Sequence, residues 1–147
     1  MLGRNTMQLD KIKICDGYEN MDFVKVTQML SQAVWSLGIG IEEVKKSAVN
    51  SALVVGAFHK DLQVGYARVI SDKTRFAYIA DVYVDDNFRH NGIAKRMMTY
   101  ILSHKSLNAV HQWLLRSAAD ELYKKVGFVP LSEPERWMEI RNKRPEY

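Results

Sequence analysis

The sequence predicts one mixed α/β domain, with an antiparallel meander in its first half and a strand-turn-helix-strand unit in its second. Three observations carry this prediction. The 147 residues, 47% of them hydrophobic, suffice for one domain with a full core and are too few for a second catalytic domain. Segments of alternating apolar residues are interspersed with segments whose apolar residues recur every three or four positions, so strands and helices mix along the chain. No repeat or linker divides the sequence, and its three prolines all follow position 129.

The chain is expected to open with a strand and two helices. In residues 11–15 isoleucines alternate with lysines, which is typical of a half-buried strand. Asp22 can cap a helix whose apolar side chains recur at three- and four-residue steps as far as Leu37. Two glycines end this helix, and residues 41–49 follow as a second, shorter helix.

An antiparallel hairpin and a central strand come next. Residues 51–58 and 62–70 are β-rich runs joined by a short connection, which is the pattern of a hairpin. Residues 75–84 are almost wholly apolar and aromatic, and this predicts a central strand covered on both faces. The period then changes, because from Gly92 the apolar residues fall on one face of a helix that runs to about His104.

The last part of the chain is predicted to hold a strand, a helix and two closing strands. Residues 109–115 have the composition of a strand, and residues 118–125 that of a helix. Two further β-rich runs, 128–131 and 136–140, are expected to close the sheet.

Composition excludes several classes of protein. The single cysteine, Cys15, rules out an internal disulfide and a multi-cysteine zinc site, and no pair of the four histidines has metal-ligand spacing, so no metal is expected. The net charge of +4 is low for a protein that neutralises a run of phosphates, so no nucleic-acid partner is expected. The longest apolar run, residues 52–58, is too short to cross a bilayer, and no signal peptide is visible. We therefore expect a cytoplasmic protein without a membrane partner.

The segment between the central strand and the following helix carries the strongest functional signal. A polar loop there leads into a helix that begins near Gly92, and the free amides of such a first turn attract anions. Gly92 allows a phosphate to approach the backbone closely, while Arg89, His90 and Lys95 add donors or charge. The sequence is thus compatible with a pyrophosphate site, although a single glycine before a helix also fits an ordinary surface loop.

Two motifs in this half of the chain resemble those of a known family. Arg89-x-x-Gly92-x-Ala94 resembles the [RQ]-x-x-G-x-[GA] acetyl-CoA motif of the GCN5-related N-acetyltransferase (GNAT) superfamily. The segment from Leu122 to Phe128, which includes Tyr123, resembles the L-Y-x-x-x-G-F segment of that family and stands in the right relative order. The resemblance spans about residues 11–140 and is nearest to small, single-domain bacterial members.

The resemblance implies a fold and a cosubstrate. The fold is α/β, a mixed central sheet with an antiparallel front meander, a splayed pair of fourth and fifth strands, and helices on both faces. It would occupy residues 1–147 as one domain, with flexible ends at 1–10 and 141–147. The implied cosubstrate is acetyl-CoA. The positions that match the family's cofactor-binding residues are Val82, Tyr83 and Val84 for the acetyl and pantetheine arm, and Arg89, His90, Asn91, Gly92, Ile93, Ala94 and Lys95 for the pyrophosphate.

Two residues are candidates for catalysis, each with a structural alternative. Tyr123 matches the usual general acid near the departing sulfur, but it could also simply pack within its helix. Asp81 is the candidate base, because a carboxylate inside an apolar run needs a reason, although a hydrogen bond to a neighbouring loop or arginine would also explain it. Glu133 and Glu139 are weaker candidates for the base. The side chain of Arg89 could brace its loop instead of touching the cofactor.

One position departs from the family pattern. Many GNAT proteins have a cofactor-contacting asparagine seven residues before the tyrosine, and here that position is Arg116. Either Arg116 contacts the cofactor differently or this contact is lost. Five residues could line an acceptor pocket, namely Tyr18, Trp35, Arg68, Tyr78 and Trp137, but aromatic residues at such spacings are more often part of a core.

The resemblance implies an N-acetyltransferase that moves an acetyl group from acetyl-CoA directly to a primary amine in a ternary complex. The acceptor could be a small-molecule amine, a protein lysine or a protein N-terminus, and a homodimer is compatible with the family. The alternative is a catalytically weak, GNAT-like module that binds acyl-CoA or regulates. Tyr123 favours the enzyme over this alternative.

Overall fold

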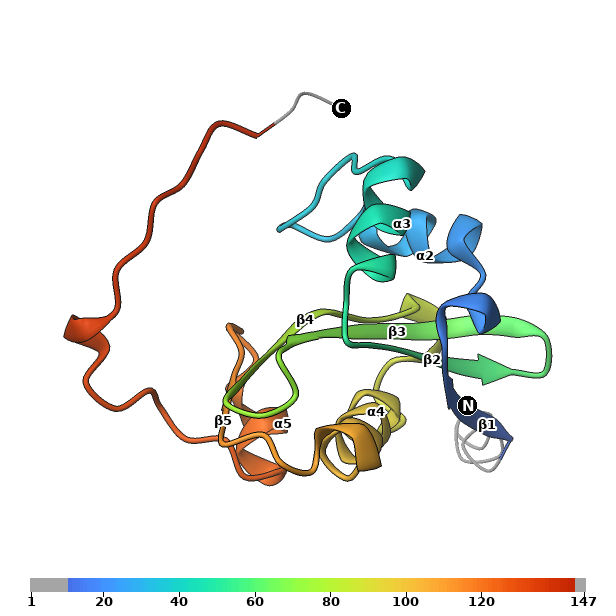
Figure 1. Cartoon of the computed structure of the whole chain (residues 1–147). Coiled ribbons are helices and arrows are strands. Elements are labelled where there is room, and N and C mark those ends of the chain that lie inside the picture. Colours follow the sequence, from blue (N-terminus) through green and yellow to red (C-terminus); the bar gives the residue numbers. More distant parts are fainter. Residues whose placement is uncertain (1–10, 145–147) are drawn as a thin grey trace.

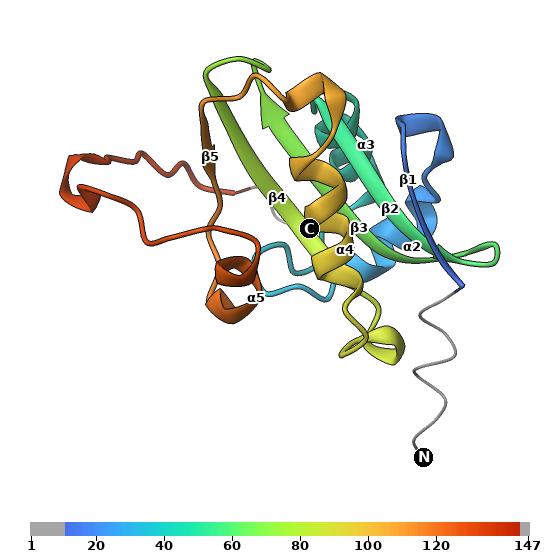
Figure 2. The same ribbon diagram turned by 90° about the horizontal axis from the view of Figure 1, so that it is seen from below.

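A computed structural model describes residues 11–144 and shows a five-stranded sheet between two layers of helices (Figure 1, Figure 2). The strands are β1 (Ile12–Asp16), β2 (Leu53–His59), β3 (Leu62–Ser71), β4 (Phe76–Val84) and β5 (Gln112–Leu114). Their order in the sheet is β1-β2-β3-β4-β5, with antiparallel pairing up to β4 and parallel pairing between β4 and β5. The predicted mixed sheet with an antiparallel front is confirmed. Of the expected flexible ends at 1–10 and 141–147, residues 1–10 and 145–147 lie outside the described residues.

The helices divide between the two faces of the sheet. They are α2 (Phe23–Leu30) and α3 (Ile41–Val49) on one face, and α4 (Ile93–Leu102) and α5 (Asp120–Lys125) on the other (Figure 1). Short 3-10 turns lie at Tyr18–Asn20, Asp86–Phe88, Lys105–Leu107 and Pro134–Arg136. Asp22 caps α2 as the sequence predicts, since its side chain accepts a hydrogen bond from the Lys25 amide at 3.2 Å.

The sheet separates two buried apolar clusters. The cluster on one face includes Val55 and Val69 of the sheet and Met97 of α4, and the cluster on the other face includes Tyr66 of the sheet and Val26 of α2. Because each helix presents one apolar stripe, each layer closes one of the two clusters. The helices on both faces that the family resemblance implies are therefore confirmed.

The first helix is shorter than its apolar pattern predicts. It ends at Leu30, and residues 31–39 form turns in which Val34 and Leu37 are exposed. The buried Ser36 hydroxyl donates to the Leu30 carbonyl at 2.7 Å, which satisfies one of the free carbonyls at the helix end. A local side-chain hydrogen bond thus replaces further helical turns, and the prediction of a helix to Leu37 is wrong.

β4 and β5 pair over only part of their length. Their register runs from Phe76 opposite Gln112 to Tyr78 opposite Leu114, whereas β4 continues to Val84. Beyond Tyr78, β4 therefore has a strand partner on one side only among the described residues, and the splayed pair is confirmed (Figure 2).

The two predicted closing strands are not formed. Residues 128–131 and 136–140 pair with no strand of the described chain, and a 3-10 turn at Pro134–Arg136 lies between them. Val129, Met138 and Ile140 in these runs are 80%, 95% and 91% exposed, whereas Phe128 is partly buried against the core. A β-rich composition marks a segment that can pair, but pairing also needs a strand within reach, and the prediction of these two strands is wrong.

Candidate functional site

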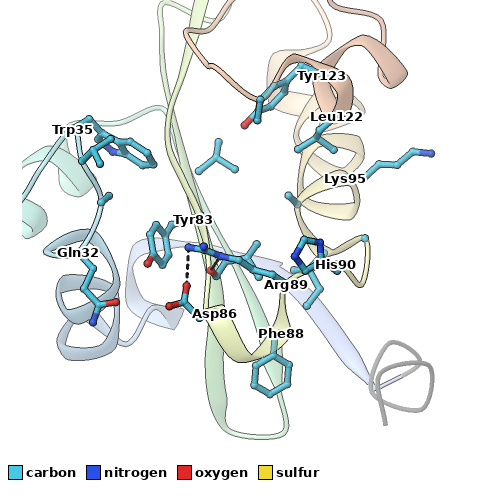
Figure 3. Close-up of a pocket in the computed structure, with 18 of the residues that line it drawn as sticks. Gln32, Trp35, Tyr83, Asp86, Phe88, Arg89, His90, Lys95, Leu122 and Tyr123 are labelled. Carbon is cyan, nitrogen blue, oxygen red and sulfur yellow. Dashed lines mark hydrogen bonds and ion pairs between the residues drawn. The ribbon is translucent and has the colours of Figure 1, made fainter. Parts of the chain in front are cut away.

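A cavity of about 880 Å³ opens where β4 and β5 separate (Figure 3). Its walls come from the end of β4, the loop to α4, the first turn of α4, α5 and the loop between α2 and α3. Ten of the predicted site residues line it, namely Val82, Tyr83, Val84, Arg89, His90, Gly92, Ile93, Ala94, Lys95 and Tyr123. The structure thus brings most of the predicted site together around one space.

The N-terminus of α4 forms one side of this cavity. Gly92 is the N-cap residue of α4 and has a left-handed backbone with φ 76°, and its carbonyl accepts the first helical hydrogen bond from the Arg96 amide at 3.0 Å. His90 also has a positive φ, of 67°. The first-turn amides of a helix have no partner within the helix, and the dipole adds positive potential there. This end of α4 is therefore suited to bind an anionic group in the cavity.

The side chain of Arg89 braces the loop against the end of β4. Its Nε donates to the Val84 carbonyl at 2.9 Å, its guanidinium pairs with Asp86 at 3.0 Å, and it stacks 4.9 Å from the centre of the Tyr83 ring (Figure 3). Asn91 does not line the cavity, and its side chain donates instead to the Phe88 carbonyl at 3.0 Å. These contacts support the bracing role of Arg89 that the sequence leaves open.

Tyr123 stands on α5 at the other side of the cavity. Its side chain is 9% exposed, and Figure 3 shows its hydroxyl directed toward β4. The ring meets Phe128 edge to face, with centroids 6.2 Å apart. Burial raises the pKa of the Tyr123 hydroxyl above its ordinary value. The group therefore stays protonated at neutral pH and is available as a proton donor.

Asp81 lies in a bulge of β4, and its carboxylate accepts hydrogen bonds from two side chains. Its φ is 57°, and the register of β3 with β4 shifts at this point, between Tyr66 and Arg68. Asp81 Oδ2 accepts from Arg68 Nε at 2.7 Å, and Oδ1 accepts from Trp35 Nε1 at 3.0 Å. Trp35 lines the cavity, whereas Asp81 does not. The structural alternative for Asp81 is thus observed, and its role as base stays a prediction.

The remaining predicted residues lie outside the cavity. Arg116 is exposed between β5 and α5 and is not among the lining residues, so its contact with a cofactor stays a prediction. Glu133 and Glu139 are exposed and pair with Arg136 and Arg141, as expected of solvated charges. Both belong to the segment after α5.

Two features of the site escape the sequence pattern. The loop between α2 and α3 contributes Gln32 and Trp35 to the cavity. Its apolar residues are spaced like those of a helix, so the sequence predicts a longer α2 in place of this loop. The second feature is an ion pair in which Lys25 Nζ of α2 lies 2.5 Å from Asp85 Oδ2, directly after β4. Burial alone would raise the pKa of Asp85, but hydrogen bonds from Lys25 and the Asn87 amide outweigh it and lower the pKa. A hydrophobic pattern carries no signal for such a long-range pair.

The described part of the chain holds neither a cluster of metal-ligating side chains nor a membrane-spanning helix. Within residues 11–144, no group of three or more His, Cys, Asp or Glu side chains is placed to hold a metal ion. In the same range, no helix is both long enough and apolar enough to span a membrane.

A family model and known proteins match this chain. The model of the acetyltransferase (GNAT) domain matches residues 50–130, which include β2 to α5 and every residue of the cavity except those of the α2–α3 loop. An uncharacterized N-acetyltransferase, ycf52-like, of Prochlorococcus marinus is 33% identical over 86 residues, which cover 56% of this chain. That match spans 47% of the relative, so the chain corresponds to about half of its length.

Solved structures share the fold over most of the chain. A protein of Xanthomonas campestris pv. campestris assigned to the GNAT acetyltransferases has a TM-score of 0.82 and 29% identity, over 89% of this chain and 93% of that one. An acetyltransferase of Clostridium acetobutylicum, solved with acetyl-CoA, has a TM-score of 0.63 and 19% identity, over 88% and 96%. The second likeness concerns the fold alone.

Proposed function

Because the chain belongs to the GNAT acetyltransferase family, we propose that it transfers an acetyl group from acetyl-CoA to a primary amine in a ternary complex. The observation that carries this proposal is the composition of one cavity. The N-terminus of α4, the free edge of β4 and the buried Tyr123 all border it. These are an anion site, a set of backbone donors and acceptors, and an acid.

The cofactor half of the proposal rests on α4 and β4. The pyrophosphate would bind the first-turn amides that follow Gly92, with Lys95 adding charge. The pantetheine arm would lie along Val82 to Val84, where β4 has no strand partner on the β5 side among the described residues. The acetyl-CoA in the Clostridium acetobutylicum structure supports this choice of cosubstrate.

The chemistry needs an acid, a base and stabilisation of a developing negative charge. The amine nitrogen forms a bond to the thioester carbonyl carbon, the bond from that carbon to sulfur breaks, and CoA leaves as a thiolate. Tyr123 donates its proton to this thiolate, and backbone amides of β4 stabilise the charge that develops on the carbonyl oxygen. No covalent intermediate on the protein is required.

Asp81 is the proposed acceptor of the amine proton. Its Oδ1 holds the Trp35 indole at 3.0 Å, and Trp35 lines the cavity. The carboxylate would exchange this hydrogen bond for one to the amine or to an ordered water. Its ion pair with Arg68 keeps the carboxylate in place while that exchange occurs.

A second candidate function is a module that binds acyl-CoA with little turnover. The observation that favours it is Asp81 itself, because both of its oxygens already have partners. Such a module would retain the anion site at α4 and lack an efficient base.

We also propose that the protein is cytoplasmic and that its acceptor is a small-molecule amine, a protein lysine or a protein N-terminus. The sequence has a single cysteine, Cys15, which is compatible with a reducing compartment.

One experiment separates the two functions. The protein is incubated with acetyl-CoA and a panel of primary amines, including polyamines and lysine peptides, and free CoA is measured. An enzyme releases CoA in an amine-dependent way, and Tyr123→Phe suppresses this release. Tyr100→Phe is the matched control, because Tyr100 bonds to Asp16 at 2.5 Å and does not line the cavity. Binding of acetyl-CoA without release for any amine would favour the binding module.

A further inference from the structure

Lys25 of α2 and Asp85, the residue directly after β4, form an ion pair that the proposed chemistry does not use. Lys25 Nζ lies 2.5 Å from Asp85 Oδ2, and the two side chains are only 18% and 16% exposed. Neither residue lines the cavity. A pair that is mostly shielded from water is screened less than a surface pair, so this contact can hold two elements in a fixed relation.

Asp85 is the first residue of the loop that leads to the anion site. Its Oδ1 accepts a hydrogen bond from the Asn87 amide at 2.9 Å, and its carbonyl accepts one from the Phe88 amide at 2.8 Å. These bonds form the cap and the body of the 3-10 turn at Asp86–Phe88, from which the chain runs to Gly92. The position of the Asp85 carboxylate therefore sets where the loop starts.

Two other side chains hold the loop by local contacts. Arg89 Nε donates to the Val84 carbonyl, five positions earlier in the chain. Asn91 donates to the Phe88 carbonyl, three positions earlier. Lys25 differs from both, because it stands 60 positions before its partner and belongs to a helix on the face of the sheet opposite α4 (Figure 1). The local contacts fix the shape of the loop, and the ion pair fixes the loop relative to α2.

The α2 side of this pair is itself anchored to the sheet. The Asp22 amide, at the N-cap of α2, donates to Oε1 of the buried Gln63 in β3 at 2.7 Å. Asp22 Oδ1 in turn accepts from the Lys25 amide at 3.2 Å. The Asp85 amide donates to the carbonyl of Val64, the next residue of β3, at 2.8 Å. These contacts close a ring through β3, the start of α2 and the start of the loop, so the ion pair joins two backbones that are already in place.

We propose that Lys25 is a positioning residue for acetyl-CoA, which acts through Asp85 and does not touch the cosubstrate. This inference rests on the proposed function. The ion pair holds the loop so that the first-turn amides of α4 meet the pyrophosphate while the thioester arm lies along β4. Without the pair, the loop keeps its local shape but loses its place relative to β4, so the two parts of acetyl-CoA no longer bind together in full.

Binding of two acetyl donors separates positioning from a general loss of structure. Acetyl-CoA contains the pyrophosphate, whereas S-acetylpantetheine has the same thioester arm and lacks it. In Lys25→Met the Kd for acetyl-CoA, measured by calorimetry, should rise about tenfold, and the Kd for S-acetylpantetheine, measured by NMR titration, should stay within about twofold. Lys25→Arg should restore most of the affinity for acetyl-CoA, because a guanidinium can also pair with the carboxylate. Lys45→Met is the matched control, since Lys45 is exposed on α3, and it should leave both Kd values unchanged.

A double-mutant cycle identifies the residue through which Lys25 acts. Asp85→Asn should raise the Kd for acetyl-CoA as Lys25→Met does, although it leaves the positive charge of Lys25 in place. The chain with both substitutions should bind acetyl-CoA no more weakly than either single variant. Circular dichroism checks that each variant is folded, and Asp85→Asn carries the comparison of the two donors if Lys25→Met does not fold.

Three results would overturn the proposal while the proposed function stands. They are an unchanged Kd for acetyl-CoA in Lys25→Met, equal losses for the two donors, and losses that add in the double variant. An unaltered chain that binds no acetyl-CoA would instead overturn the proposed function, and this inference with it.

Discussion

Arg68 and Asp81 lie on adjacent strands, β3 and β4, with Arg68 Nε 2.7 Å from Asp81 Oδ2. The pair sits at the bulge where Asp81 adopts a left-handed backbone. Trp35 extends this contact to the cavity, because its indole bonds to the other carboxylate oxygen. One hydrogen-bond network thus connects the Asp81 carboxylate, the bulge of β4 and the loop between α2 and α3.

This network makes the proposed base testable. Asp81→Asn keeps the shape of the side chain and removes its basicity, so turnover should fall about 100-fold and the acid limb of the pH–rate profile should disappear. Arg68→Gln is the control, because it breaks the same ion pair and keeps the carboxylate. Equal losses in the two variants, with the acid limb preserved, would mean that Asp81 acts only on structure.

The proposed acid makes a prediction about turnover and affinity together. Tyr123→Phe should lower kcat about 100-fold and leave the Kd for acetyl-CoA, measured by calorimetry, unchanged, because the ring keeps its packing on Phe128. Unchanged turnover would reject the role of Tyr123 as acid.

The pH dependence of the same residue follows from its burial. Because burial raises the pKa of Tyr123, the folded protein holds this proton more tightly than the unfolded chain. Its contribution to stability is full below the unfolded pKa of about 10 and is lost as pH rises beyond it. Urea unfolding between pH 8 and pH 11 should show a decline that is smaller in Tyr123→Phe.

The anion site predicts an order among two substitutions. Gly92→Val places a β-branched residue at a φ of 76°, although a Cβ there would meet no atom within 4 Å. The backbone must shift to relieve this conformation, so the Kd for acetyl-CoA should rise about tenfold in Gly92→Val. The Kd should rise by less in Lys95→Gln, because that variant removes only one charge.

A second glycine controls for stability in this experiment. Gly127 has a φ of 109° and also has open space around it, but it does not line the cavity. Gly127→Val should therefore destabilise the protein without a matching loss of affinity. Calorimetry that shows a greater loss of affinity in Lys95→Gln than in Gly92→Val would contradict the backbone site.

The ion pair between Lys25 and Asp85 predicts a dependence of stability on acid. The pKa of Asp85 is lowered in the folded state, so its contribution is present above the unfolded value of 3.8 and is lost as pH falls through the folded value. Lys25→Met should lower the free energy of unfolding by about 1–3 kcal/mol at pH 7, and the difference should shrink toward pH 3. Urea titrations at both pH values measure this, with the exposed Lys45→Met as control. A difference that is the same at both pH values would exclude the charge of Asp85 as its cause.

The sequence predicts the elements that depend on local pattern and misses those that depend on distant contacts. The hairpin of β2 and β3, the helix after Gly92 and the place of Tyr123 follow from periodicity and from two short motifs. The end of α2 does not follow from periodicity, because the Ser36 hydroxyl donates a hydrogen bond to the Leu30 carbonyl. The spacing of apolar residues carries no information about this hydrogen bond.

The partners of Asp81 and the two unformed closing strands were missed for the same reason. Asp81 accepts hydrogen bonds from Arg68 and Trp35, which stand 13 and 46 positions away in sequence. Residues 128–131 and 136–140 have the composition of strands, but composition does not say whether a neighbouring strand is within reach. The family and most of the fold could therefore be predicted, whereas the long-range polar contacts could not.

The two apolar clusters on either side of the sheet share no residue. Substitutions that accumulate under α2 and α3 therefore leave the packing of α4 untouched, and with it the end of the helix at Gly92. The segment that holds Trp35 can therefore diverge during evolution while α4 keeps its packing. We expect lineages of this fold to differ most in the segment between α2 and α3, where the acceptor would enter.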